Sequence, residues 1–115
     1  MKVYLIIITP EAERDINNIG SYVALNDLPG KATDLCDALE RKCDSLSYVP
    51  QRGRCVPEFK NIDVFDIFEI FYKPYRIVYK ILNTSVVIYG VFDGRRDLKE
   101  VLPHRVLGRT VFEYH

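Results

Sequence analysis

Residues 72–98, with the sequence YKPYRIVYKILNTSVVIYGVFDGRRDL, contain two apolar runs that are typical of neighbouring β-strands. The runs, Tyr75–Leu82 and Val86–Phe92, are rich in Ile, Val, Tyr and Phe, and the polar Asn83-Thr84-Ser85 separates them. This pattern predicts a β-hairpin with a three-residue connection. Because the second run is almost wholly apolar, both of its faces should be covered, and we expect the two strands to lie centrally in a sheet.

Cationic residues occupy defined places in this hairpin. In the first strand, a period of two puts Arg76 and Lys80 on one face with a single Val between them. The second strand ends at Asp93-Gly94, and two adjacent arginines, Arg95 and Arg96, follow it. We therefore expect Arg76 and this arginine pair to converge at the sheet if the hairpin register allows it.

The N-terminal half predicts a short strand followed by two helices. The apolar run Lys2–Ile8 suits an interior strand, and Thr9 and Pro10 suit the N-cap and the first position of a helix. Residues 26–30 break this helix, and apolar residues at helical spacing then predict a second helix: Ala32, Leu35, Cys36, Leu39, Cys43 and Leu46. The short link favours an antiparallel helical hairpin against one face of the sheet.

The remaining segments complete an α+β fold. Tyr48–Lys60 has no sustained periodicity and is predicted to be a loop, whereas Phe65–Phe71 is predicted to be a further strand. Helical spacing after Asp97 predicts a short C-terminal helix. We expect a single domain of residues 1–115, with a mainly antiparallel twisted sheet of about four strands and a flexible tail at residues 108–115.

Composition narrows the classes of function. The formal net charge is +0, although residues 1–50 hold five Lys or Arg and eight Asp or Glu, and residues 51–115 hold eleven and eight. This charge argues against non-specific coating of nucleic acid, and any anionic contact should involve the C-terminal half. Cys36, Cys43 and Cys55 have no metal-ligand spacing, which predicts reduced, buried thiols. The apolar start is too short to span a membrane, so we expect a cytoplasmic protein without metal, cofactor or membrane partner.

Short motifs along the chain carry a family resemblance. In chain order they are Thr9–Ile16, Val49–Gly53, Val56–Phe59, Lys73–Tyr79 and Asp93–Leu98. With the predicted order of elements, the sequence resembles the RelE/ParE superfamily of toxins from bacterial type II toxin–antitoxin modules. The resemblance implies a toxin that a cognate antitoxin holds inactive by wrapping an amphipathic segment around it. It also implies that oligomers form through the antitoxin complex.

The superfamily divides by target. RelE-like members cleave messenger RNA at the ribosome without a metal, whereas ParE-like members inhibit DNA gyrase by protein contact. By motif, Arg76 and Arg96 match arginines of the nucleases, but Ile67 and Glu69 stand where the nucleases have lysines, and Leu102 where they have a tyrosine. These departures favour a ParE-like inhibitor of DNA gyrase. The alternatives are a RelE-like ribosome-dependent mRNA endonuclease and a non-toxic module that only binds the antitoxin.

Three sets of residues are candidates for these roles. The catalytic candidates of a nuclease are Arg76, Arg96 and Glu69, and the candidates for target contact are Arg76, Lys80, Arg95 and Arg96. One helical hairpin cannot cover all the apolar strand residues, so we expect an antitoxin groove lined by Phe65, Phe68, Phe71 and Tyr79. Structural alternatives stay open: Arg76 pairs with Asp66 or Glu69, and the aromatic residues pack in the core.

Overall fold

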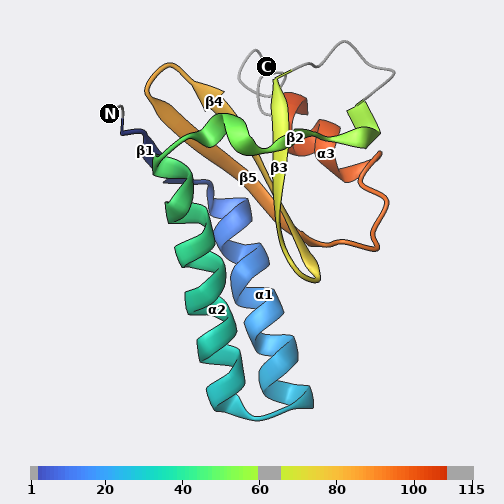
Figure 1. The fold of residues 1–115 in the computed structure, drawn as a ribbon. Helices are drawn as coiled ribbons and strands as arrows, with labels where there is room; N and C mark the ends of the chain where they lie inside the picture. The colour runs from blue at the N-terminus through green and yellow to red at the C-terminus, as the bar shows by residue number, and fades with distance from the viewer. Residues whose placement is uncertain (1–2, 60–65, 109–115) are drawn as a thin grey trace.

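The computed structural model describes residues 3–59 and 66–108, in which a helical hairpin packs against a mixed five-stranded sheet (Figure 1). The elements are β1 (Leu5–Ile8), α1 (Pro10–Asn26), α2 (Pro29–Asp44), β2 (Arg54–Cys55), β3 (Ile67–Tyr72), β4 (Tyr75–Leu82), β5 (Ser85–Asp93) and α3 (Val101–Pro103). The 3-10 turns η1 (Ser45–Ser47), η2 (Pro50–Arg52) and η3 (Pro57–Phe59) lie between α2 and β3, and the π-helical turn η4 (His104–Gly108) follows α3. The tail expected to be flexible lies, beyond Gly108, outside the described residues.

The sheet has the strand order β1-β5-β4-β3-β2, with β1 parallel to β5 and the other neighbours antiparallel. The predicted α+β class is confirmed. Two details of the predicted strand arrangement are wrong. The expected loop contains β2, because Arg54 and Cys55 pair with Glu69 and Phe68 of β3. In addition, β1 lies at an edge of the sheet and not in its interior, because its parallel pairing with β5 leaves its other side without a neighbouring strand among the described residues.

The β4–β5 hairpin has the expected central position but a tighter turn. Leu82 pairs with Ser85, so only Asn83 and Thr84 connect the two strands. Asn83 has φ 57°, a left-handed conformation that asparagine adopts more readily than most residues. The turn chemistry therefore suits a two-residue connection better than the predicted three-residue one.

The helical hairpin is anchored to the sheet at its first residue. The Thr9 hydroxyl accepts a hydrogen bond from the Ala12 amide at 3.2 Å and donates one to the Ile88 carbonyl of β5 at 2.8 Å. The predicted N-cap thus also fixes α1 against the central strands. The two helices cover one face of the sheet, and the core between them includes Ile16, Leu39, Cys43, Leu46, Ile77, Tyr79 and Ile88. Among the described residues, the helices are all too short or too polar to cross a membrane.

A second apolar cluster lies on the opposite face of the sheet. It contains Val56, Phe59, Ile67, Val78, Phe92, Leu98 and Leu102, so the predicted C-terminal helix packs here. The Arg105 guanidinium joins this helical segment to α1 through two bonds to the Asp15 carboxylate, at 2.8 and 3.0 Å. The helix begins at Val101 and not directly after Asp97, whose side chain accepts a bond from the Lys99 amide instead.

The three cysteines differ in their surroundings. Cys43 is fully buried, Cys36 is half-buried between the helices, and Cys55 is exposed on β2. Burial raises the pKa of the Cys43 thiol to about 12. The expectation of buried thiols is therefore correct for Cys43 and wrong for Cys55, because the short strand β2 lies at the edge of the sheet.

Candidate functional site

Arg76 lies on β4, on the sheet face opposite the helical hairpin. The strand register places it beside Phe71 of β3 and Phe92 of β5, and Phe92 belongs to the second apolar cluster. Side chains of directly paired residues share one face of a sheet. The guanidinium is therefore held at the end of an apolar cluster, and the residue is only 5% exposed.

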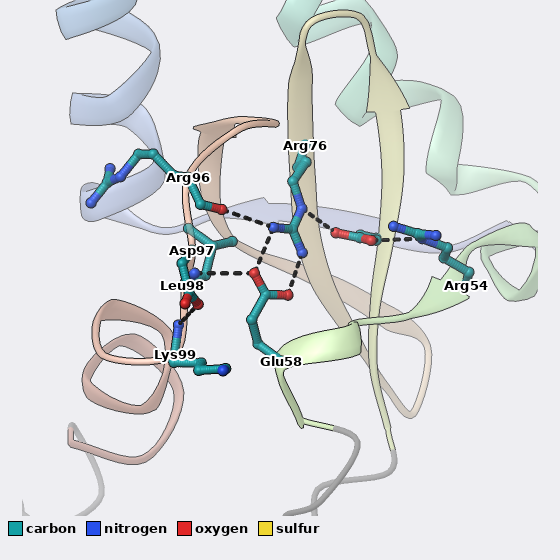
Figure 2. A network of polar contacts seen from close by, with 8 residues as sticks. Arg54, Glu58, Arg76, Arg96, Asp97, Leu98 and Lys99 are labelled. Carbon is teal, nitrogen blue, oxygen red and sulfur yellow. Dashed lines mark hydrogen bonds and ion pairs between the residues drawn. The ribbon is translucent and has the colours of Figure 1, made fainter.

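Two carboxylates neutralise Arg76. Glu58 of η3 receives two bonds from the guanidinium, Nη2 to Oε1 at 2.6 Å and Nη1 to Oε2 at 2.7 Å. Glu69 of β3 accepts a bond from Nε at 2.7 Å, and its other oxygen accepts one from Nε of Arg54 on β2, also at 2.7 Å. These four side chains, which we call the Arg76 network, have a formal net charge of zero (Figure 2).

Glu58 also binds the segment that precedes α3. Its Oε2 accepts a bond from the Leu98 amide at 3.0 Å, and Arg76 donates to the Arg96 carbonyl at 3.3 Å (Figure 2). Hydrogen bonds from Arg76 lower the pKa of Glu58 to about 2, although partial burial opposes this shift. Glu58 in turn raises the pKa of Arg76 above its already high value. Both groups therefore stay charged at neutral pH.

An open pocket of about 370 Å³ lies beside the Arg76 network. Its charged lining residues are Arg54, Glu58, Arg76, Arg95, Arg96, Asp97 and Lys99. The structure thus brings Arg76, Arg95 and Arg96 to one site. The three arginines differ in their contacts. Arg95 is exposed and pairs with Asp93 at 3.0 Å. The guanidinium carbon of Arg96 lies 5.6 Å from the centre of the Phe92 ring.

The other polar candidates lie elsewhere or are enclosed. The Glu69 side chain is 0% exposed and both of its oxygens are ion-paired, so in this arrangement it cannot exchange a proton with a bound substrate. Lys80 pairs with Asp66 at 3.2 Å and does not line the pocket. His104 is not among the candidates; it is exposed after α3 and lines a neighbouring hollow. Within residues 3–59 and 66–108, no group of three or more His, Cys, Asp or Glu side chains could hold a metal ion.

Glu58 and Arg54 are the site residues that sequence reasoning missed. Glu58 lies 18 residues before its partner Arg76, in a segment without periodicity, so no local pattern predicts the ion pair. Its only signal is its place in the motif Val56–Phe59. For Arg76, the open alternative of pairing with Glu69 is correct, whereas Asp66 pairs with Lys80 instead.

The expected aromatic groove is not present as predicted. Tyr79 is fully buried and its hydroxyl donates to the Pro50 carbonyl at 2.6 Å, so it cannot line an open groove. Phe68 packs beside it, with 5.9 Å between the ring centres, so the core alternative is correct for these two. Phe71 is 42% exposed and lies below the Arg54 guanidinium, and Phe65 falls outside the described residues.

An exposed apolar surface instead lies toward the other edge of the sheet. Leu5 and Ile7 of β1 are 65% and 42% exposed, and Leu82 of β4 is 51% exposed. Leu5 pairs with Ser85, which in turn pairs with Leu82, so these side chains share the face opposite the helical hairpin. We call Leu5, Ile7 and Leu82 the β1 surface.

Comparisons with solved structures identify the type of fold. A chain of the chromosomal ParDE toxin–antitoxin system from P. aeruginosa is similar at TM-score 0.66 and 15% identity, over 79% of this chain and 96% of that chain. A chain of the RelBE2 toxin–antitoxin complex from Mycobacterium tuberculosis is similar at TM-score 0.56 and 26% identity, over 81% and 93%. A mutant of the E. coli toxin RelE in the free state is similar at TM-score 0.57 and 16% identity, over 93% and 97%.

These likenesses show a fold shared with chains of the ParDE and RelBE2 toxin–antitoxin systems and with the toxin RelE. The family model of the ParE toxin of the type II toxin–antitoxin system parDE matches residues 6–98. The chain belongs to this family of toxins, and its partner is a cognate antitoxin, as the sequence motifs had indicated. Among curated proteins, none matches the sequence.

Replacing Arg76 by Ala should destabilise the protein by about 3–5 kcal/mol, because Glu58 and the enclosed Glu69 each lose a cationic partner. The matched control is Arg95→Ala, which removes an exposed ion pair at the same pocket and should change the free energy of unfolding little. Urea unfolding followed by circular dichroism measures both. Equally small effects of the two substitutions would contradict a structural role for Arg76.

Glu58 should make stability depend on pH in the acidic range. Its pKa falls from the usual 4.5 to about 2 in the folded protein, so its contribution is complete above pH 4.5 and is lost as the pH falls toward 2. Glu58→Gln should therefore lower stability at neutral pH and flatten its dependence on pH in this window. Thermal unfolding between pH 2 and 7 tests this, with the exposed Glu40→Gln as the control of equal charge change. A steep acid profile that survives in Glu58→Gln would refute the assignment.

Proposed function

We propose that this toxin inhibits DNA gyrase by protein contact and is not a nuclease. The observation that carries the proposal is the state of Arg76, the strand arginine that matches the nucleases by motif. Its guanidinium is 5% exposed and bound by Glu58 and Glu69. A guanidinium that holds a scissile phosphate needs free N–H donors directed at it, and here two carboxylates already use them.

The rest of the site supports the same conclusion. Ile67 and Glu69 stand where nuclease members have lysines, and both are buried, so they supply no exposed cation. Leu102, which stands where the nucleases have a tyrosine, is fully buried in the second apolar cluster. General acid–base chemistry needs a titratable group within reach of the substrate, and these positions offer none. The near-zero net charge also gives little attraction to RNA.

A ribosome-dependent mRNA endonuclease is the second candidate. It is favoured by the exposed cations that line the pocket beside the Arg76 network, of which Arg54, Arg95, Arg96 and Lys99 belong to the described residues. Such a cluster would suit contact with a phosphate backbone. It would equally suit an acidic protein surface, because arginine is common at the centres of protein interfaces.

The β1 surface is the proposed site of the antitoxin. A strand at the edge of a sheet can accept a further strand, and exposed Leu5, Ile7 and Leu82 can bind the apolar side of an amphipathic segment. On this proposal, oligomers form through the antitoxin and not through the toxin alone. Since gyrase and ribosomes are cytoplasmic, the toxin would act in the cytoplasm.

Purified toxin should block supercoiling of relaxed plasmid by DNA gyrase and leave a ribosome-bound message intact. The reason is that Glu58 already occupies the guanidinium fork of Arg76, whereas the exposed cations at the pocket are available for protein contact. Both assays are run at equal toxin concentrations, and addition of the antitoxin should restore supercoiling. Cleaved message with normal supercoiling would establish the nuclease instead, and no effect in either assay would leave an antitoxin-binding module.

Leu5→Lys should weaken binding of the antitoxin, because it places a charge within the β1 surface. Leu25→Lys is the matched control, since Leu25 is 86% exposed near the end of α1, far along the chain from this surface. Titration calorimetry of each variant with the antitoxin gives the change in affinity. We expect a loss of roughly tenfold or more for Leu5→Lys and little for Leu25→Lys. Equal affinities would show that the antitoxin binds elsewhere.

A further inference from the structure

The surroundings of the Glu58 carboxylate are those of a bound anion. Both of its oxygens face the guanidinium fork of Arg76, at 2.6 and 2.7 Å, and one also accepts the Leu98 amide at 3.0 Å (Figure 2). A bidentate guanidinium together with a backbone N–H is a common way in which proteins hold phosphate groups. The donors around Glu58 are therefore the donors that a phosphate would require.

The pocket around this carboxylate is rich in cations. Five of its described lining residues are cationic, Arg54, Arg76, Arg95, Arg96 and Lys99, whereas two are acidic, Glu58 and Asp97. Asp97 directs a carboxylate oxygen to the Lys99 amide, and so it is not the partner of the guanidinium fork. Glu58 is thus the one acidic group, among the described lining residues, that occupies the anion position.

We propose that Glu58 is an internal substitute for a phosphate group, which fills a phosphate-binding site and keeps external phosphates out of it. The inference rests on the proposed function and deepens it, because it names the residue that prevents the pocket from binding the backbone of RNA. An attached carboxylate competes as an intramolecular ligand, so a free phosphate would have to exceed its effective concentration, on the order of millimolar or more.

A purely structural ion pair would behave differently when Glu58 is removed. If Glu58 only stabilises the fold, its loss lowers stability and changes the affinity for anions only by the general effect of one charge, which salt screens. If it occupies a phosphate site, its loss frees the Arg76 fork and the Leu98 amide inside a pocket that is already shaped around them. The folded variant then gains affinity for phosphate that depends on the Arg76 fork, and a lost structural contact does not provide a gain of this kind.

The test compares the wild-type chain with Glu58→Ala and Glu58→Gln in inorganic phosphate and in chloride at equal ionic strength. A ligand that binds the folded state raises the midpoint of thermal unfolding, so the phosphate-dependent rise reports affinity. We expect both variants to bind inorganic phosphate roughly tenfold or more tightly than the wild type. Glu58→Gln keeps the size of the side chain and its hydrogen-bonding oxygen, and so it provides a folded variant if Glu58→Ala unfolds.

Two controls locate the gained site. Glu40→Gln changes the net charge by the same amount on the exposed face of α2 and should gain nothing. Adding Arg76→Gln to Glu58→Gln should abolish the gain, because it removes the guanidinium fork. A short single-stranded RNA, followed by fluorescence anisotropy, separates the two sources of phosphate: tighter RNA binding by the Glu58 variants indicates a backbone phosphate, and a gain for inorganic phosphate alone indicates the free anion.

The inference is overturned if the folded Glu58 variants bind phosphate no more tightly than the wild type and Glu40→Gln. It is equally overturned if the gain persists in the double variant with Arg76→Gln, because the site would then lie elsewhere. These outcomes are separate from the fate of the proposed function, which depends on how the wild-type toxin behaves toward gyrase and ribosome-bound message.

Discussion

The pairing of Arg76 with two carboxylates is the constraint on which the rest of the site depends. A guanidinium in an apolar setting is costly unless its charge is compensated, and here the compensation comes from η3 and β3. Glu58 in turn holds the Leu98 amide, so one side chain connects a loop, the central strand and the approach to α3. The irregular segment around η3 is therefore held in place by the ion pair of Glu58 with Arg76, and this ion pair also sets the position of the pocket.

Local patterns in the sequence predict most of the fold. Thr9 followed by Pro10 predicts the start of α1, and two apolar runs separated by a polar turn predict the central hairpin. Both signals depend only on near neighbours in the chain. The predictions that are wrong concern features that depend on pairing between distant segments. The edge position of β1 follows from its parallel alignment with β5, and β2 exists because Arg54 and Cys55 reach β3. Because β2 has only two residues, it is too short to show the alternation that would predict a strand.

The candidate site divides in the same way. Convergence of Arg76 with Arg95 and Arg96 could be predicted, because one lies on a central strand and the others follow the end of its partner. Their chemical state could not be predicted, since it depends on Glu58, a residue from an irregular segment. Tyr79 is predicted to line an exposed groove but is buried. The alternation of residues along β4 assigns Tyr79 to one face of the sheet, but it does not reveal that α2 and the turn at Pro50 cover that face.

The distance between the two proposed binding regions sets the length of antitoxin chain that would be needed to contact both. The β1 surface lies at the Leu82 end of the β4–β5 hairpin, and the pocket beside the Arg76 network lies at the opposite end. Strands are spaced by about 4.8 Å, so β1 and β4, two steps apart, are separated by about 10 Å across the sheet. Leu82 and Arg76 are about 20 Å apart along β4, because extended chain advances about 3.3 Å per residue, so roughly seven residues cover the diagonal distance. An antitoxin segment bound at the proposed β1 surface would therefore need about seven further extended residues to reach the pocket as well.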